Sequence, residues 1–413
     1  MKLSSWLLKT VIAAFAVIAL AVVLFTVLPN NADIPKLYID GDISKMLTKS
    51  DVRDIAIRYV DGTEEITGYA KIKIQGTSSI GYRKKNYTVE FFEDSDHDNK
   101  LKINVGWGDQ NKYCFKANWI DRTHARNVVA ARLASQMQAK YDLLTNAPKN
   151  GLVDGFPVEI YSNGIFLGLY TMNIPKDAWQ FDMDKDNQDH IVIGGEGWSD
   201  ANLFHAMPSF ETWAVEVGEE SPETLAKMER LFDFVINSTD EEFRDQFEEY
   251  FDLDSALNYY VFSDITYLAD NLGKNMLLAT YDGMVWYLSL YDLDTSWGTR
   301  WDGFDVGNYD TGLLKLKRNN LFARMEKVFP ELLAERYFEL REDILSNEHM
   351  MEELEAFRDE IPASTMMKEK LRWWLPYVLV KAKRFPGYDY SQIEEYLNAV
   401  STNLDNKYAA MLG

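Results

Sequence analysis

The chain has 413 residues and a net charge of −22, and 46% of its residues are hydrophobic and 14% aromatic. This length and composition can bury a large core, which excludes an intrinsically disordered protein. The acidic balance argues against a nucleic-acid-binding protein, because such proteins usually present a basic face. The single cysteine, Cys114, excludes an intramolecular disulfide framework, and beside Tyr113 and Phe115 we expect it to be a buried apolar residue.

An apolar run without charges covers residues 10–28 and follows Lys2 and Lys9. Its length is near the roughly 20 residues that span a bilayer, and it exceeds the roughly 7–15 residues of a cleaved signal core. The positive charges before it predict that residues 1–9 stay in the cytoplasm. We therefore predict a transmembrane signal anchor, a linker over 29–35 and an extracytoplasmic body. A cleaved signal peptide is the alternative, and it would give a secreted protein.

The part from residue 36 to 175 is predicted to be rich in β-strands. Its runs alternate between apolar and polar residues, and the turn signals Asp61-Gly62 and Asn163-Gly164 separate two pairs of them. Within it, Thr123 to Lys140 has helical periodicity, with Thr123 as the expected N-cap. The predicted strands are 36–39, 55–60, 68–74, 87–92, 156–161 and 165–172.

The part from residue 176 to 413 is predicted to be mainly helical, with one hairpin that turns at Asp282-Gly283. Pro330 is expected to break or kink one of the helices. The predicted helices are 222–237, 239–250, 254–267, 321–357 and 365–380, and the hairpin pairs 275–281 with 286–292. The result is an α+β chain with a β-rich N-lobe and a mainly helical C-lobe, which is the layout of a two-lobed kinase.

Acidic residues gather around this hairpin. Asp270 and Asn275 have the Asp-x-x-x-x-Asn spacing of kinase catalytic loops, and Asp292 and Asp294 end an apolar strand. Asp270 is the candidate for orienting the acceptor hydroxyl. Asn275, Asp292 and Asp294 are candidate ligands for Mg²⁺ or Mn²⁺, which prefer oxygen donors. Residues two apart share one strand face, so both carboxylates can reach the same ion. The alternative is a polar turn with solvated carboxylates.

A second group of candidates would bind phosphate. Gly76, Ser78 and Ser79 can form a turn whose backbone N–H groups approach phosphate oxygens, although an ordinary strand-ending turn has the same composition. Arg126, near the start of the predicted helix, could pair with a phosphate or a metal-bound carboxylate, or form a structural ion pair.

Two lysines, Lys84 and Lys85, precede the strand 87–92, and only one of them can face a cleft. Lys85 is favoured because it shares strand parity with Tyr87, Val89 and Phe91. Its role would be that of a positive charge on the phosphates of ATP. The alternative is that both lysines are solvated.

Together, these segments resemble the spore-coat-protein-H family of secreted atypical protein kinases (CotH kinases). The similar segments occur in the family's order and cover 74–79, 82–87, 118–127, 163–170, 270–275 and 291–298. One departure is that Asn173-Ile174-Pro175-Lys176 stands where the family often has a glutamate.

The resemblance implies a two-lobed protein-kinase-like fold and transfer of the γ-phosphoryl group of ATP to Ser or Thr of a protein, with Mg²⁺ or Mn²⁺. The acidic surface favours a basic protein acceptor. Two alternatives remain open. One is a non-catalytic surface or coat-assembly protein or an adhesin. The other is an enzyme with different nucleotide chemistry, such as AMP transfer or glycan phosphorylation.

Overall fold

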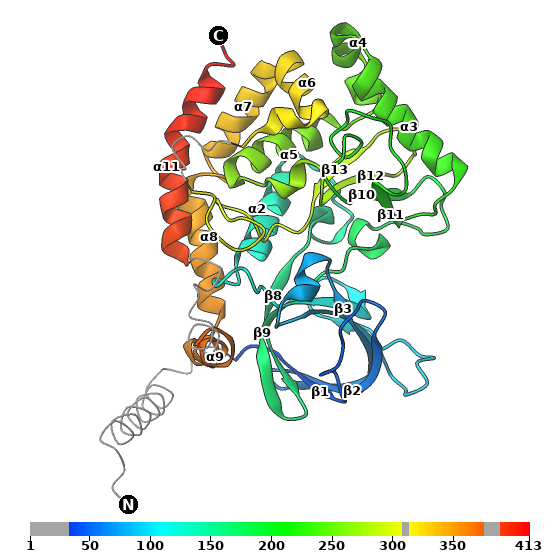
Figure 1. Ribbon diagram of the computed structural model, residues 1–413, viewed down its shortest axis with the longest axis vertical. Helices are drawn as coiled ribbons and strands as arrows, with labels where there is room; N and C mark the ends of the chain where they lie inside the picture. The colour runs from blue at the N-terminus through cyan, green and yellow to red at the C-terminus, as the bar shows by residue number, and fades with distance from the viewer. Residues whose placement is uncertain (1–32, 308–313, 376–388) are drawn as a thin grey trace, which may run out of the picture.

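Alternating apolar and polar residues build the first part of the chain into a closed β-barrel (Figure 1). The computed structural model describes residues 33–307, 314–375 and 389–413. The barrel order is β1-β2-β3-β4-β7-β9-β8, and all neighbours are antiparallel except β1 and β8, which close the barrel in parallel. The strands are β1 (Lys36–Asp40), β2 (Val52–Asp61), β3 (Glu64–Gln75), β4 (Asn86–Phe92), β7 (Lys112–Lys116), β8 (Gly155–Ser162) and β9 (Ile165–Asn173).

The barrel encloses its own hydrophobic core, which includes Ile57, Ile72, Val89 and Val158. The strands predicted in this part are confirmed, with slightly longer ends. Strand β7 was not predicted, because only three apolar residues lie between its terminal lysines. It carries Cys114, which is buried as expected, and burial raises the pKa of its thiol.

A second sheet lies in the other part of the molecule, with the order β11-β10-β12-β13. Its strands are β10 (Ile191–Gly195), β11 (Trp213–Val217), β12 (Met276–Thr280) and β13 (Tyr287–Leu290). The hairpin β12–β13 confirms the prediction. Strands β10 and β11 fall in a stretch predicted to be mainly helical, because a run of only five residues has too little periodicity to separate strand from helix.

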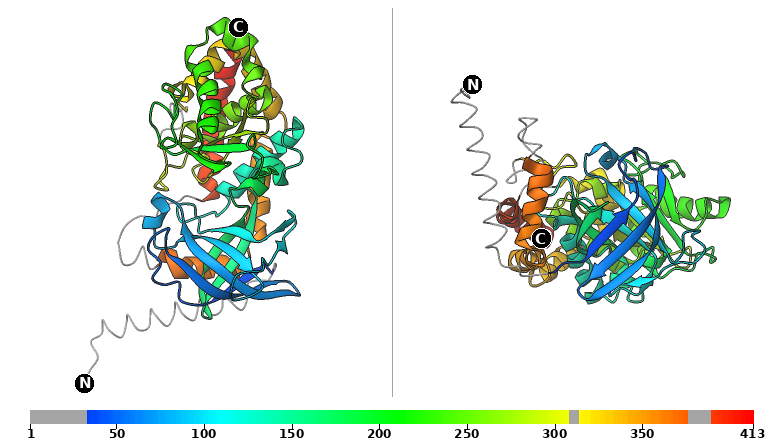
Figure 2. Two further views of the ribbon diagram at one scale, coloured as in Figure 1. Left: turned by 90° about the vertical axis from the view of Figure 1, so that its right-hand side faces the viewer. Right: turned by 90° about the horizontal axis from the view of Figure 1, so that it is seen from below.

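Most helices pack around this second sheet, above the barrel in Figure 1 and in the left view of Figure 2, whereas α9 (Ala363–Glu369) lies beside the barrel. The helices are α2 (Arg126–Lys140), α3 (Pro222–Asn237), α4 (Asp240–Asp245), α5 (Leu253–Thr266), α6 (Asn320–Val328), α7 (Pro330–Arg341), α8 (Asn347–Glu360), α9 (Ala363–Glu369) and α11 (Tyr390–Ala409). The single helix predicted over 321–357 is three helices. Pro330 opens α7, so the predicted break there is confirmed.

Helix α2 differs from its prediction at the N-terminus and in its packing. It begins at Arg126 instead of after Thr123, because Asp121 binds the first free amide: its Oδ2 accepts from Arg126 N at 3.0 Å. The apolar residues of α2, such as Val129 and Leu133, belong to the core of the helical part. Helix α2 therefore packs within the helical part, although it lies between two barrel strands in the sequence.

The barrel and the helical part are joined by an ionic cluster around Asp154, just before β8. Its carboxylate accepts from Arg132 Nε at 2.9 Å, Trp107 Nε1 at 3.1 Å and Lys149 Nζ at 3.1 Å. Arg132 lies on α2 and also binds Glu360 at the end of α8, at 2.7 Å. One buried carboxylate thus ties a barrel strand to two helices.

No helix within the described ranges is long and apolar enough to cross a membrane. The predicted anchor at 10–28 lies outside those ranges.

Replacing Asp154 with Ala should lower the free energy of unfolding by about 2 kcal/mol, because it leaves the partly buried guanidinium of Arg132 and the indole of Trp107 without their shared acceptor. Urea unfolding followed by tryptophan fluorescence measures the loss. Glu360→Ala is the matched control on the same arginine. Its side chain is 35% exposed, so the loss should stay below about 1 kcal/mol. Equal losses would contradict the central role of Asp154.

Candidate active site

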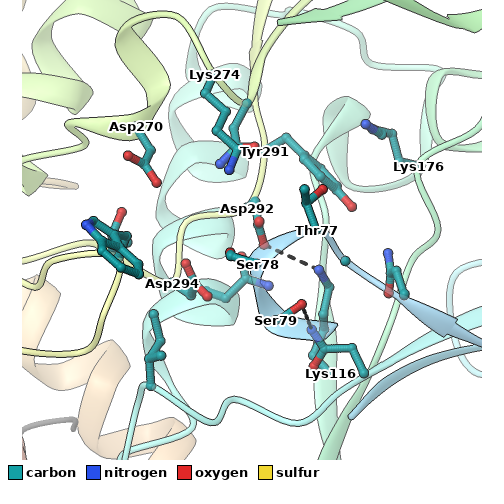
Figure 3. A pocket seen from close by; sticks show the side chains of 18 of the residues that line it. Thr77, Ser78, Ser79, Lys116, Lys176, Asp270, Lys274, Tyr291, Asp292 and Asp294 are labelled. Carbon is teal, nitrogen blue, oxygen red and sulfur yellow. Dashed lines mark hydrogen bonds and ion pairs between the residues drawn. The ribbon is translucent and has the colours of Figure 1, made fainter. Parts of the chain in front are cut away.

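A cavity of about 450 Å³ lies where the barrel meets the helical part (Figure 3). The barrel contributes the end of β3, the turn after it and the chain that follows β7. The helical part contributes the ends of β10, β11 and β13 and the segment before β12. The residues that line it include Gly76, Thr77, Ser78, Ser79, Lys116, Asn118, Trp119, Asn127, Lys176, Glu216, Asp270, Lys274, Asn275, Tyr291, Asp292, Asp294 and Trp301.

Asp292 stands just beyond β13 in the left-handed backbone region, with φ of 56°. This conformation is uncommon for a residue other than glycine and persists only where surrounding contacts impose it. Two buried amides do so here. Asn271 Nδ2 donates to Tyr291 O at 2.8 Å, and Asn127 Oδ1 accepts from Leu293 N at 2.8 Å. The backbone is therefore fixed on both sides of Asp292.

Asp292 and Asp294 both line the cavity. The prediction that they share one face of a strand is wrong. Strand β13 ends at Leu290, and the left-handed turn at Asp292 breaks the two-residue alternation. A turn, not a strand, therefore brings the two carboxylates to the same space.

Asp270 and Asn275 also line the cavity, on the segment between α5 and β12. Asn275 is left-handed, with φ of 63°, and its N–H donates to Gly195 O at 3.0 Å. The segment packs so closely on β10 that a Cβ atom on Gly195 would lie 1.8 Å from Gly273 O. A glycine is required at that crossing.

The carboxylates influence one another. Burial, and then the charge of Asp292, raise the pKa of Asp294 well above its ordinary value. Burial also raises the pKa of Asp270, where Lys274 opposes the shift and Asp292 adds to it. A cation placed among these groups would relieve both effects.

Lys116, the last residue of β7, faces these carboxylates, and its Nζ lies 3.3 Å from Asp292 Oδ1 (Figure 3). Burial by itself lowers the pKa of Lys116, but Asp292 and Tyr291 outweigh it, so the net pKa is raised. The ammonium group therefore stays charged. Sequence reasoning missed this residue, although it lies only two residues before the 118–127 segment that carried part of the family resemblance.

A second missed lysine, Lys176, also lines the cavity, beside Tyr291. Its Nζ pairs with Glu216 and lies 4.7 Å from the centre of the Tyr291 ring. It belongs to the Asn173–Lys176 segment that departs from the family pattern. The departure therefore places a lysine inside the cavity.

The predicted turn at 76–79 borders the same space (Figure 3). Gly76 has φ of 110°, and a Cβ atom there would lie 1.9 Å from Ser79 Oγ. No other residue fits this turn without displacing Ser79. Gly76, Ser78 and Ser79 are thus brought together with the acidic residues.

Lys84, Lys85 and Arg126 are not brought to the cavity. Lys84 is buried against Glu369 of α9, a contact across 285 residues that strand parity cannot anticipate. Lys85 lies before β4 begins, and its Nζ donates to Ile80 O. Arg126 forms a structural ion pair, which was the alternative to a phosphate contact. Its Nε lies 3.4 Å from Asp121 Oδ1, and its Nη1 donates to Ser296 O.

The donors at the carboxylate pair are oxygen atoms, which suit Mg²⁺ or Mn²⁺. In the described part of the chain, no group of three His, Cys, Asp or Glu side chains forms a complete metal site. Mg²⁺ commonly uses one or two carboxylates and completes its shell with water and phosphate oxygens. Asp292 and Asp294, with their neighbouring lysine, therefore fit a metal–phosphate ligand better than a lone ion.

The fold and cavity together define an α+β protein with a phosphate- and metal-compatible site. The family model described as "CotH kinase protein" matches residues 72–408, which is most of the chain. The chain therefore belongs to the CotH kinase family, as its motifs predicted, and this membership points to a kinase. A search of curated proteins finds no match.

Asp294→Asn should raise the melting temperature of the metal-free protein at pH 7 by roughly 2 °C. The reason is that the folded-state pKa is raised, so stability falls as pH rises from the ordinary aspartate pKa to the folded one. Asparagine cannot ionise, so the variant avoids this loss of stability. The difference in melting temperature between the variant and the wild type should shrink toward pH 4, where Asp294 is protonated.

The same variant should lose most of the thermal stabilisation that Mn²⁺ gives the wild type, because one ligand is gone. Differential scanning calorimetry with and without Mn²⁺ measures both effects. Asp186→Asn, an exposed carboxylate elsewhere, is the control and should change neither. A lower melting temperature without metal, or an undiminished Mn²⁺ effect, would contradict this assignment.

Proposed function

We propose that this protein is an exported protein kinase that transfers the γ-phosphoryl group of ATP to Ser or Thr of a surface or coat protein, with Mg²⁺ or Mn²⁺. The observation that carries the proposal is the convergence of Lys116, Asp270, Asp292 and Asp294 on one cavity. Lys116 lies 176 residues before Asp292 in the sequence, and the chain belongs to a kinase family.

In this proposal the barrel corresponds to the N-lobe of a kinase-like fold and the helical part to its C-lobe. Lys116 and the turn at Gly76–Ser79 would hold the phosphates from the barrel side. Asp292, Asp294 and Asn275 would hold the metal ion from the other side. When bound, that ion supplies neutralisation of the phosphate charge.

Asp270 would orient the acceptor hydroxyl and take its proton as the oxygen–phosphorus bond forms and the bond to the leaving ADP oxygen breaks. Its raised pKa suits proton uptake better than that of an ordinary carboxylate. Charge neutralisation and positioning account for most of the catalysis that such a transfer needs.

The cellular setting is also part of the proposal. Residues 10–28 would anchor the protein with its body outside the cytoplasm, or would be removed as a signal. The net charge of −22 favours a basic acceptor protein by electrostatic attraction.

Incubation of the full chain in detergent with γ-labelled ATP, Mn²⁺ and a basic Ser-containing acceptor should give labelled acceptor. Asp270→Asn, Asp292→Asn and Lys116→Met should each lower the rate by about 10²-fold or more, because they remove the proton acceptor, a metal ligand and the cation at the phosphates, respectively. Lys102→Met, an exposed lysine on the barrel part, is the control and should keep the wild-type rate.

Absence of both label and metal-dependent nucleotide binding would reject the kinase and favour a non-catalytic assembly or adhesion protein. Label from α-labelled ATP would indicate AMP transfer instead. Label on a glycan that resists protease digestion would indicate a different acceptor class.

An anchored protein should stay in the membrane pellet after alkaline carbonate washing, because a buried apolar helix is not released by charge or pH. In intact cells, added protease should digest its body if that body lies outside. Recovery of the whole chain in the wash would contradict the anchor, and a shortened chain in the medium would indicate signal cleavage.

A further inference from the structure

A buried ion pair connects the barrel to helix α9. Lys84 Nζ lies 2.7 Å from Glu369 Oε1, and each side chain is 1% exposed. Lys84 precedes β4 in the barrel, whereas Glu369 ends α9, which lies against the barrel's outer side (Figure 1). Buried charges are costly unless paired and hydrogen-bonded, so this contact needs further partners.

The barrel wall is shaped to receive this glutamate. Glu369 Oε2 accepts from Leu169 N at 2.8 Å, and the neighbouring Trp373 Nε1 donates to Leu167 O at 2.9 Å. Between them, Gly168 leaves room for the contact. A Cβ atom there would lie 2.7 Å from Lys84 Cε and 3.0 Å from Glu369 Oε2. Three successive residues of β9, Leu167, Gly168 and Leu169, thus form the binding surface for Glu369 and Trp373.

The same lysine reaches the chain that lines the cavity. Lys84 Nζ donates to Ala117 O at 3.0 Å, and Asn86 Oδ1 accepts from Ala117 N at 2.7 Å. Ala117 lies between Lys116 and Asn118, which both line the cavity. Both polar groups of this residue are therefore held by side chains.

We infer that the Lys84–Glu369 pair is a positioning device for Lys116, which it holds at the phosphate side of the cavity through Ala117. Neither member of the pair lines the cavity, so neither is a catalytic residue. Glu369 keeps Lys84 in place, Lys84 fixes the Ala117 carbonyl, and Lys116 is thereby aimed at Asp292. The role of Lys116 rests on the proposed function, whereas its ordering by the pair does not.

A purely stabilising role predicts something different. Replacing both members of a buried ion pair with apolar residues of similar size is often neutral or stabilising. A structural pair would therefore be dispensable once both charges are removed. A positioning pair would not be dispensable, because no apolar side chain can donate a hydrogen bond to Ala117 O.

The test compares the full-length double variant Lys84→Met/Glu369→Leu with wild type in two measurements. One is hydrogen exchange of the amides in 112–120, and the other is Mn²⁺-dependent binding of a fluorescent ATP analogue. The double variant should fold but exchange roughly tenfold faster in that segment and bind the analogue roughly tenfold more weakly, because a misplaced group loses its binding energy.

The control is a second lysine–carboxylate pair outside the cavity lining, Asp264 of α5 with Lys407 of α11, 2.6 Å apart, in which Asp264 is buried and Lys407 is 20% exposed. The double variant Asp264→Leu/Lys407→Met should leave both measurements at wild-type values. If Lys84→Met/Glu369→Leu fails to fold, Glu369→Gln keeps an acceptor for Lys84 and should show smaller changes in the same direction.

Wild-type exchange and affinity in the folded Lys84/Glu369 variants would overturn the inference. Failure of the wild type to bind the analogue would reject the proposed nucleotide site instead. The exchange measurement would still decide whether the pair orders Lys116. The two failures are thus distinguishable.

Discussion

The contact between Lys116 and Asp292 is the constraint on which the site depends, because it joins opposite charges from the two parts of the molecule. The barrel supplies the cation at the end of β7, and the helical part supplies the carboxylates after β13. Each charge would be costly alone in a partly enclosed cavity. Held together, they form a polar site that suits a ligand with both anionic groups and a bound cation, which describes a metal–nucleotide complex.

Local backbone geometry keeps the acidic side in place. Asp292 and Asn275 both adopt left-handed conformations, and the buried amides of Asn127 and Asn271 support the first of them. These turns keep the carboxylates together at the cavity although their charges repel. The raised pKa of Asp294 reflects the same crowding, because burial and the charge of Asp292 both disfavour its ionised form.

Contacts across long stretches of sequence hold the cationic side. Asp154 ties the barrel to α2 and α8, and Glu369 of α9 inserts into the wall of β9. The C-terminal helices therefore do more than cover the hydrophobic core. They also bind the barrel, directly through Glu369 of α9 and by way of Arg132 through Glu360 of α8, at residues outside the cavity lining.

By itself, the sequence determined the α+β class, most barrel strands, the hairpin β12–β13 and the family, because periodicity, turn residues and short motifs are local signals. It also located four residues of the cavity, Asp270, Asn275, Asp292 and Asp294, because each belongs to a short motif that can be read from neighbouring residues. Only the tertiary structure decided which lysine faces them. Lys84 and Lys85 lie in a suitable motif, but neither reaches the cavity. Lys84 is buried against Glu369 of α9, and Lys85 precedes β4, so its strand parity does not set its direction. Lys116 holds the place instead, because barrel closure and a non-local ion pair bring the end of β7 to Asp292, and no local pattern encodes that distance.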